Sequence, residues 1–269
     1  MRTLSSRDNP HIKLLHELAS SARERRLRRL TLLDGAHLVA AARACGWPIH
    51  EILVSDEGLA NPEIVRLLDE ATGCITTTHV LGRAFAHISP VDTPSGIVAL
   101  IDYPADDGAP PAPGASILVL EAVQDPGNLG SILRTAAAAG LRDVFLTESS
   151  TQAWSPRVLR AGMGGHFELR IREGADAVNV LDAFTGQSIA TMLGDAARPL
   201  FSVDLRQPVA WLFGAEGAGL SDRLAARADT KVTIPMPGRV ESLNVGAAVA
   251  VCLFEQLRQG QAGAARAPG

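Results

Sequence analysis

Residues 116–121 read Ser-Ile-Leu-Val-Leu-Glu, and an alanine-rich stretch follows them over about residues 129–139. A short, continuous apolar run of this kind is typical of a parallel strand that is covered on both faces. The alanine-rich stretch favours a helix, because alanine has the highest intrinsic helix propensity. A strand that leads through a turn into a helix is the unit from which α/β sheets are built, so this stretch predicts an α/β fold around it.

The same alternation of strand and helix patterns continues toward the C-terminus. Strands that alternate with helices predict a mostly parallel sheet. Further strands are expected at 143–147, 168–171, 188–193, 209–213 and 231–234. Further helices are expected near 155–162, 174–184, 219–226 and 243–259.

A spacer separates this region from the beginning of the chain. Residues 102–115 read Asp-Tyr-Pro-Ala-Asp-Asp-Gly-Ala-Pro-Pro-Ala-Pro-Gly-Ala, a composition that marks a domain boundary. We therefore expect a first domain over 1–101, a linker over 102–115 and a second domain over 116–269. The first domain mixes both patterns and is expected to be a small α/β unit. Its helices are expected near 11–29, 35–45, 62–71 and 79–87, and its strands at 49–54, 74–77 and 96–101.

The composition excludes several classes of protein. With 269 residues, 46% of them hydrophobic, and a net charge of -4, the chain is neither intrinsically disordered nor collagen-like. Cys45, Cys74 and Cys252 form no CxxC pair and the histidines no HExxH pattern, so we expect neither a disulfide framework nor a metal site. No apolar run approaches a bilayer-spanning length, and the N-terminus does not read as a signal peptide. A cytoplasmic protein without a membrane segment is therefore expected.

Three segments rich in glycine and asparagine each follow an expected strand of the second domain. Open α/β sheets bind ligands beyond the carboxyl ends of their strands, so these segments are expected to converge at one edge. In the first segment Pro126 and Gly127 form a turn, Asn128 is a candidate helix N-cap, and Arg134 lies about two helical turns further on. Taken alone, the spacing of this segment favours an ordinary strand–turn–helix junction with a solvent-exposed arginine over a functional site.

The second segment, residues 212–221, reads Leu-Phe-Gly-Ala-Glu-Gly-Ala-Gly-Leu-Ser and holds one carboxylate, Glu216. Loops dense in glycine let a ligand approach the backbone, whose amides can then bind an adenine or a carboxylate. The GxxGxG spacing is neither the GxGxxG fingerprint nor a P-loop. This argues against a nicotinamide dinucleotide or a nucleoside triphosphate as the ligand.

The third segment, residues 234–248, reads Ile-Pro-Met-Pro-Gly-Arg-Val-Glu-Ser-Leu-Asn-Val-Gly-Ala-Ala. Its prolines and glycine hold an irregular loop, and Ser242 or Asn244 can cap the helix that follows. The small residues 246–248 allow that helix to pack closely on a neighbour. A capped terminal helix explains this segment alone, but the three segments together indicate one shared site.

In this order, the patterns NxGxxxR, FGxEGxGLS and IPMxGxxESLNVxxA over residues 128–248 resemble the three motifs of the SpoU (TrmH) family of RNA ribose 2'-O-methyltransferases, in the SPOUT superfamily. Residues 33–37 and 93–99 resemble the substrate-binding domain that precedes the catalytic domain in many members. The resemblance implies a C-terminal SPOUT domain with a mostly parallel sheet and a trefoil knot, preceded by a small α/β RNA-binding domain. It also implies S-adenosylmethionine as the methyl donor and structured RNA, ribosomal or transfer, as the partner. A homodimer that packs through the helix at about 243–259 is implied as well.

The resemblance assigns roles to residues by their position in the motifs. Those implied to be catalytic are Arg134, Asn128, Glu216, Ser242 and Asn244. Those implied to surround the cofactor, mostly with backbone groups, are Leu212, Gly214, Gly217, Ile234, Met236 and Leu243. The chain departs from the motifs at two positions, because Ala215 replaces the usual asparagine and Gly246 replaces a serine that is often present.

Methyl transfer to a ribose requires that the hydroxyl be aligned with the methyl group and lose its proton. An arginine is a poor general base, because the pKa of a guanidinium lies above about 12. We therefore interpret Arg134 as a fixed cation that holds the adjacent phosphate and stabilises the developing alkoxide. Ser242, Asn244 or water would then relay the proton.

A basic patch lies near the N-terminus, where residues 1–30 hold eight Lys or Arg and three Asp or Glu. We expect Arg25, Arg26, Arg28 and Arg29 to bind RNA phosphates, because RNA is recognised largely through its backbone and shape. The alternative is an ordinary solvated helix face.

Two other functions compete with methyl transfer. A non-catalytic RNA-binding or ribosome-binding protein on the same scaffold is suggested by Ala215 and Gly246. A dinucleotide-dependent oxidoreductase is disfavoured, because the Rossmann fingerprint is absent.

Overall fold

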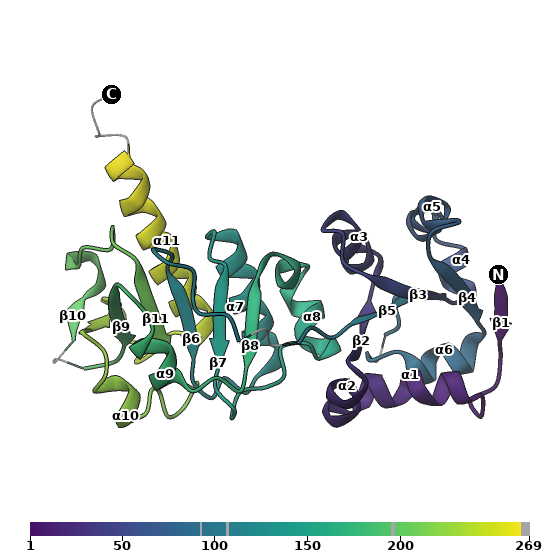
Figure 1. The fold of residues 1–269 in the computed structure, drawn as a ribbon, viewed down its shortest axis with the longest axis horizontal. Coiled ribbons are helices and arrows are strands. Elements are labelled where there is room, and N and C mark those ends of the chain that lie inside the picture. The colour runs from purple at the N-terminus through teal and green to yellow at the C-terminus, as the bar shows by residue number, and fades with distance from the viewer. Residues whose placement is uncertain (92, 106–107, 195–196, 265–269) are drawn as a thin grey trace. The chain divides into compact units, whose positions relative to one another are not determined.

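The computed structural model describes residues 1–91, 93–105, 108–194 and 197–264, which form two compact units. The first unit comprises Met1–Ala105 together with Gln152–Phe167, and the rest of the described chain forms the second unit. Each unit is built around its own sheet (Figure 1).

The first unit contains a mixed five-stranded sheet. Its strands are β1 (Arg2–Leu4), β2 (Leu30–Asp34), β3 (Ile49–Val54), β4 (Thr76–Val80) and β5 (Ile97–Asp102). Its helices are α1 (Pro10–Ser20), α2 (Ala22–Arg28), α3 (Ala36–Ala44), α4 (Asp56–Leu59), α5 (Pro62–Ala71), α6 (Gly82–Ile88) and α8 (Pro156–Gly162). The strand order is β1-β4-β3-β5-β2, in which β5 runs antiparallel to both of its neighbours. This arrangement is the small α/β unit that the sequence predicts.

The single helix expected near 11–29 is wrong, because the structure has two helices there. Ser21 separates them with an extended backbone (φ -112°, ψ 115°), and its side chain accepts a hydrogen bond from the backbone N–H of Glu24. A serine in this position acts as the N-cap of α2, so it ends one helix and starts the next. Strands β1 and β2 and the short helix α4 were not expected.

The core of the first unit is formed by helices on both sides of the sheet (Figure 1). From α1 and α6, Ile12, Leu15 and Phe85 pack against Leu32 and Leu53 of the sheet. Helices α3 and α5 lie on the opposite side. Each fully buried side chain of this kind stabilises the fold by about 1.5 to 3 kcal/mol.

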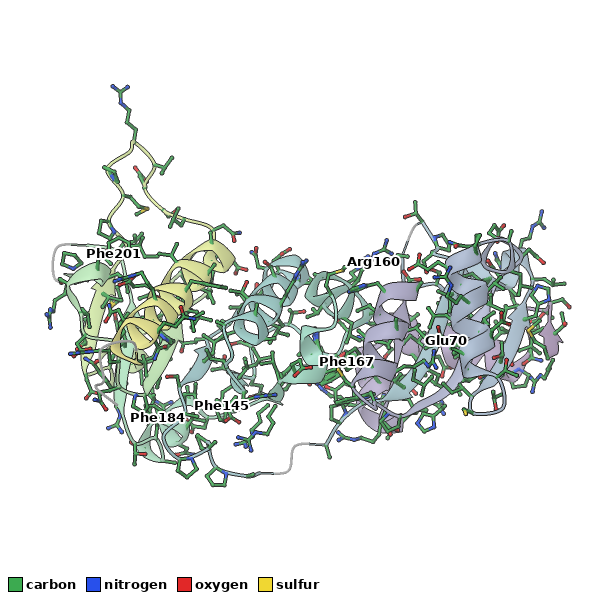
Figure 2. The ribbon with its side chains drawn as sticks, turned by 90° about the horizontal axis from the view of Figure 1, so that it is seen from above. Glu70, Phe145, Arg160, Phe167, Phe184 and Phe201 are labelled. Carbon is green, nitrogen blue, oxygen red and sulfur yellow. The ribbon has the colours of Figure 1, made fainter. Side chains whose placement is uncertain are left out.

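The segment 152–167 belongs to the first unit although it comes from the middle of the chain. The hydroxyl of Thr31 donates to the carbonyl of Trp154 (2.8 Å), and Arg160 donates to Asp34 (2.7 Å). Arg160 and Phe167 are labelled in Figure 2. Asp34 also accepts from Ser95, and burial raises its pKa although Ser95 and Arg160 oppose that rise. The expected second domain runs without interruption over 116–269, whereas the structure groups residues 152–167 with the first unit.

A buried histidine in this segment should make the stability of the protein depend on pH. His166 is 0% exposed, its Nε2 bonds the carbonyl of Ala153, and burial lowers its pKa to about 4. The unfolded chain therefore binds a proton at His166 that the folded chain excludes, and stability falls as the pH drops from 6.5 toward 4. Between pH 7 and pH 5 the expected loss from this residue is about 2 kcal/mol.

Urea unfolding of the wild type and of His166→Gln at both pH values checks this expectation. Glutamine keeps a donor for the Ala153 carbonyl and has no pKa in this range, so the variant should lose less stability between pH 7 and pH 5. Equal losses in the two proteins would contradict the prediction.

The second unit contains a seven-stranded sheet in which every pairing is parallel. Its strands are β6 (Ile117–Leu120), β7 (Asp143–Leu146), β8 (Arg170–Glu173), β9 (Gln187–Thr191), β10 (Arg198–Pro199), β11 (Val209–Phe213) and β12 (Thr230–Thr233). Its helices are α7 (Pro126–Ala138), α9 (Ala177–Asp182), α10 (Asp222–Ala225) and α11 (Val245–Ala264). The strand order is β10-β12-β9-β11-β6-β7-β8. The prediction of a mostly parallel sheet is confirmed, and the trefoil knot stays a prediction.

Helices cover both faces of this sheet (Figure 1). On one face, Phe145 and Phe184, both labelled in Figure 2, share a core with residues of α9 and α10. On the other face α7 packs against α11, and Trp211 of β11 donates through Nε1 to Gln256 of α11 (2.8 Å). Burial on both faces explains why β6 and β11 are continuous apolar runs. Among the described residues, no helix combines the length and the apolar character needed to cross a membrane.

Candidate functional site

The three segments singled out in the sequence meet in the second unit. The side-chain amide of Asn244 donates to Oδ1 of Asn128 (2.8 Å), and the amide of Asn128 donates to Oε1 of Glu216 (2.9 Å). Asn128, Glu216 and Asn244 come after strands β6, β11 and β12 in the chain, and all strands of the sheet are parallel. The carboxyl ends of these strands therefore lie at one edge of the sheet, where ligands of α/β sheets bind.

The local structure around each asparagine sets the direction of its side chain. Asp125, and not Asn128 as expected, is the N-cap of α7, because its Oδ1 accepts from the backbone N–H of Asn128 (2.7 Å). This leaves the side chain of Asn128 available to the two loops. Asn244 caps α11, with Oδ1 accepting from the N–H groups of Gly246 (2.9 Å) and Ala247 (3.3 Å). Its amide group is consequently directed toward Asn128.

The loop after β11 is closed by backbone hydrogen bonds that require glycine. Ala215 and Gly219 exchange two bonds, of 3.1 and 2.9 Å between nitrogen and oxygen. A Cβ atom at Gly214 would lie 2.0 Å from the carbonyl carbon of Gly219, a distance that no side chain allows. Gly219 has a φ of +69°, which favours glycine. The glycines of this motif therefore serve the folding of the loop itself.

Glu121 anchors the far end of the same loop. It follows β6 directly, and its carboxylate accepts from the backbone N–H (2.7 Å) and the hydroxyl (2.8 Å) of Ser221. Sequence reasoning did not single out this residue. The available signal was a carboxylate at the carboxyl end of a fully apolar strand.

A cavity of about 490 Å³ opens beside these loops. Its volume lies in the range of small-molecule sites. The residues expected around the cofactor that line it are Gly214, Gly217, Ile234, Met236 and Leu243, and the expected catalytic residues that line it are Glu216, Ser242 and Asn244.

Leu212 does not line this cavity. Its side chain is fully buried in the core of the sheet, and its carbonyl accepts from the hydroxyl of Thr191 (3.0 Å). Residues 191–193, at the end of β9 and just after it, also line the cavity. They were not identified as site residues from the sequence. The position of these residues at the carboxyl end of a parallel strand was the signal that could have found them.

Arg134 is exposed on α7 and does not line the cavity. Within the described ranges its guanidinium makes no hydrogen bond or ion pair with the protein. It lies one turn beyond Ser131, whose hydroxyl is 3.6 Å from the place that a Cβ of Gly246 would occupy. Arg134 is thus on the stretch of α7 next to the start of α11, with all its donors available.

The structure corrects the expectation for one arginine of the basic patch. Arg25 is only 5% exposed, and its guanidinium donates to Leu18 and Gln152 inside the first unit. Arg28 pairs with Glu17 and Glu24.

The two remaining arginines of the patch lie at the surface. The guanidinium of Arg29 stands 5.3 Å from the ring centre of Tyr103. Arg26 is exposed, and in the part of the chain that the structure describes it has no side-chain partner. Arg26 is therefore the member of the patch most available to a phosphate.

The cavity suits an organic ligand with an apolar ring system. Ile234, Met236 and Leu243 supply apolar walls, and the glycine-rich loop supplies backbone groups at close range. Among the described residues, no cluster of three or more His, Cys, Asp or Glu side chains is placed to hold a metal ion.

Comparison with known proteins identifies the family of the chain. Residues 115–254, more than half of the chain, match the SpoU rRNA Methylase family. The chain belongs to this family. Residues 9–99, which lie in the first unit, match the MRM3-like substrate binding domain. The resemblance seen in the three motifs is thereby confirmed.

Relatives match this SpoU-family chain over nearly its whole length. An uncharacterized tRNA/rRNA methyltransferase of Synechocystis is 34% identical, with 96% of this chain and 94% of the relative covered. The 23S rRNA (guanosine(2553)-2'-O)-methyltransferase RlmP of Bacillus subtilis is 31% identical, with coverage of 94% and 98%. The crystal structure of an rRNA methyltransferase from Sinorhizobium meliloti with bound AdoMet has a TM-score of 0.81 at 29% identity, covering 96% of this chain and 97% of that one.

Proposed function

We propose that this protein transfers a methyl group from S-adenosylmethionine to the 2'-hydroxyl of a ribose in ribosomal RNA. The observation that carries the proposal is the chain of hydrogen bonds from Asn244 through Asn128 to Glu216 beside the glycine-rich cavity. The proposal is supported by the family and by relatives that match nearly the whole chain, among them the Bacillus subtilis 23S rRNA enzyme.

The cavity fits S-adenosylmethionine in its chemistry. Ile234, Met236 and Leu243 would hold the adenine between apolar side chains, and the backbone of the loop 214–220 would provide polar contacts. The backbone of this loop is accessible, because residues 216–219 are exposed. When bound, S-adenosylmethionine supplies the methyl group on a positively charged sulfur.

Arg134 would hold the RNA at the reacting ribose. Its five N–H donors have no protein partner in the described chain, and a planar guanidinium binds a phosphate with two parallel hydrogen bonds. The same positive charge stabilises negative charge on the ribose oxygen as the proton leaves. Arg134 therefore orients the substrate and lowers the energy of the developing alkoxide.

Ser242 and Asn244 are the polar side chains of the third segment that would guide the proton. Both line the cavity. Asn244 is held by Asn128, and Asn128 is held by Glu216, so the amide groups keep one orientation. Fixed groups of this kind need no reorganisation during the reaction, which is the main source of electrostatic catalysis.

The rival function, a non-catalytic RNA-binding protein, is suggested by Ala215 and Gly246, and the structure weakens the argument from Ala215. Ala215 uses its backbone N–H and carbonyl to close the loop with Gly219, and these bonds do not depend on the side chain. The replacement of asparagine by alanine at this position therefore leaves the closure of the loop intact.

We also propose that the protein forms a homodimer through α11 and acts in the cytoplasm, where ribosomal RNA is found. Phe254 on α11 is 47% exposed, which leaves a large apolar side chain for a partner copy to cover. Light scattering of the wild type and of Phe254→Glu tests the dimer, because the charged variant should be monomeric.

The function is tested with the purified chain, methyl-labelled S-adenosylmethionine and ribosomal RNA from a strain that lacks the gene. Transfer of label to one ribose, mapped by its resistance to alkaline hydrolysis, is the expected result. Calorimetry separates the rival, because a protein that does not bind S-adenosylmethionine at millimolar concentration cannot be the proposed enzyme.

Replacing Glu121 by alanine is expected to loosen the loop 214–220, whose backbone is proposed to contact the cofactor. The variant loses both hydrogen bonds to Ser221, and charge-assisted bonds contribute about 1.5 to 3 kcal/mol when buried, less here because the pair is partly exposed. We expect an affinity for S-adenosylmethionine about tenfold lower, equivalent to about 1.4 kcal/mol.

The matched control for this variant is Glu148→Ala. Glu148 is exposed near the end of the neighbouring strand β7 and has no partner in the described part of the chain. Calorimetry should give wild-type affinity for this control. An unchanged affinity in Glu121→Ala would show that Ser221 does not need the carboxylate.

A further inference from the structure

A second cavity, of about 720 Å³, lies within the first unit between α1, α6 and the start of α8. No aspartate or glutamate is found among the described residues that line it, whereas two arginines and two histidines are. Cationic and aromatic walls of this kind are suited to a ligand that carries negative charge. It is separate from the methyl-transfer site, whose residues all belong to the second unit.

The two histidines form a fixed aromatic surface in this cavity. The rings of His16 and His87 are stacked, with their centres 3.8 Å apart and their planes 9° from parallel. Nδ1 of His16 lies 2.7 Å from the carbonyl of His87, so this nitrogen carries the hydrogen. Because the bond fixes the ring of His16, the pair presents a flat face on which a nucleic acid base can stack.

The two arginines contribute in different ways. Arg25 has its guanidinium held by Leu18 and Gln152, so it adds fixed positive charge to the wall. Arg157 is exposed at the start of α8, and the described chain offers it no hydrogen bond or ion pair. Its guanidinium is available for two hydrogen bonds to a phosphate.

We propose that this cavity binds one nucleotide of single-stranded RNA, with the phosphate on Arg157 and the base against the stacked His16–His87 pair. Pro90 and Pro94 give the cavity an apolar wall that would cover the other side of the base. The proposal rests on the proposed function, because it takes RNA as the substrate. It adds a specific contact in the first unit that uses Arg157, His16 and His87, which lie outside the basic patch, beside Arg25 of the patch.

The test is binding of a fluorescein-labelled oligouridylate to the full-length protein, without S-adenosylmethionine. Fluorescence anisotropy over a range of salt concentrations measures affinity, and the proton NMR signals of the imidazoles report where the oligonucleotide binds. The signals of His16 and His87 are assigned with the variants His16→Gln and His87→Gln. Two variants disrupt the proposed site in different ways: Arg157→Glu removes the phosphate contact, and Ala86→Trp, at an exposed position of α6, places a large side chain in the cavity.

The control is Arg66→Glu, an exposed arginine of α5 on the other side of the same sheet. We expect oligouridylate to shift the signals of His16 and His87 and to leave that of His79 unchanged. Arg157→Glu should reduce the slope of log affinity against log salt by about 0.7, the value for one phosphate contact on a single strand. Ala86→Trp should abolish the shifts, and Arg66→Glu should behave as the wild type.

Three results would overturn the proposal. Binding that leaves both histidine signals in place would locate the RNA elsewhere. An equal loss in Arg66→Glu and Arg157→Glu would show a diffuse charge effect. Shifts of the same size with inorganic phosphate at equal concentration would make the cavity an anion site that does not recognise a nucleotide. None of these results bears on methyl transfer, which the labelling assay measures independently and whose absence from the wild type would instead refute the proposed function.

Discussion

Arg134→Lys is expected to lower the rate of methyl transfer to RNA by about 10²- to 10³-fold, as removal of one preorganised donor from a transition state does. Lysine keeps the positive charge but loses the planar arrangement of donors that binds a phosphate at two points. Arg134 lies outside the cofactor cavity, so the affinity for S-adenosylmethionine should not change. The loss should therefore fall on the chemical step and on RNA binding.

Single-turnover rates at saturating RNA, together with calorimetry of S-adenosylmethionine, measure the two quantities separately. Arg223→Lys is the matched control, because Arg223 is exposed on α10 of the same unit and does not line the cofactor cavity. Its rate should equal that of the wild type. If Arg134→Lys kept near-normal turnover with an unshifted pH profile, a point charge would suffice and the two-point contact would be refuted.

Most strands of the second sheet could be predicted from sequence, including β8 at one edge, whereas the very short edge strands β10 and β1 could not. The apolar run that forms β6 is short and is flanked by turn-forming residues, which favours a strand buried on both faces over a helix. Strand β10 has two residues and β1 has three, which is too short for any period to show. These strands exist because neighbouring strands offer them hydrogen bonds, and this is information about the assembled sheet.

The location of the candidate site could be predicted from the sequence, but the roles of several of its residues could not. Glycine and asparagine after parallel strands mark a binding edge, and Asn128 and Asn244 are in fact hydrogen bonded there. Which residue caps a helix depends on local backbone geometry, and Asp125 is favoured over Asn128 for that reason. The role of Glu121 depends on a partner a hundred residues away, Ser221, which no local pattern reveals. The sequence around Arg25 predicts an exposed cation, because its hydrogen-bond partner Gln152 lies far away in the chain.

Gly214→Ala is expected to disrupt the loop 214–220 and to lower the affinity for S-adenosylmethionine by about 5- to 150-fold. The added Cβ would lie 2.0 Å from the carbonyl carbon and 2.1 Å from the carbonyl oxygen of Gly219, and both are backbone atoms that no rotamer change can move away. The loop can accept the methyl group only by breaking the hydrogen bonds between Ala215 and Gly219. Overpacking of this kind costs about 1 to 3 kcal/mol, which corresponds to about a 5- to 150-fold weaker ligand if the bound state must restore the loop.

The matched control is Gly238→Ala, in the loop after β12, where an added Cβ would meet no atom within 4 Å. This variant has the same chemical change without the collision, so its affinity for S-adenosylmethionine should be that of the wild type. Calorimetry measures both variants, and urea unfolding shows whether the loss in Gly214→Ala comes from the loop or from the whole unit. Since β11 ends at Phe213 and is buried in the sheet, a collision confined to residues 214–220 should leave most of the stability in place. Wild-type affinity in Gly214→Ala would mean that the closed loop is not the conformation that binds the cofactor.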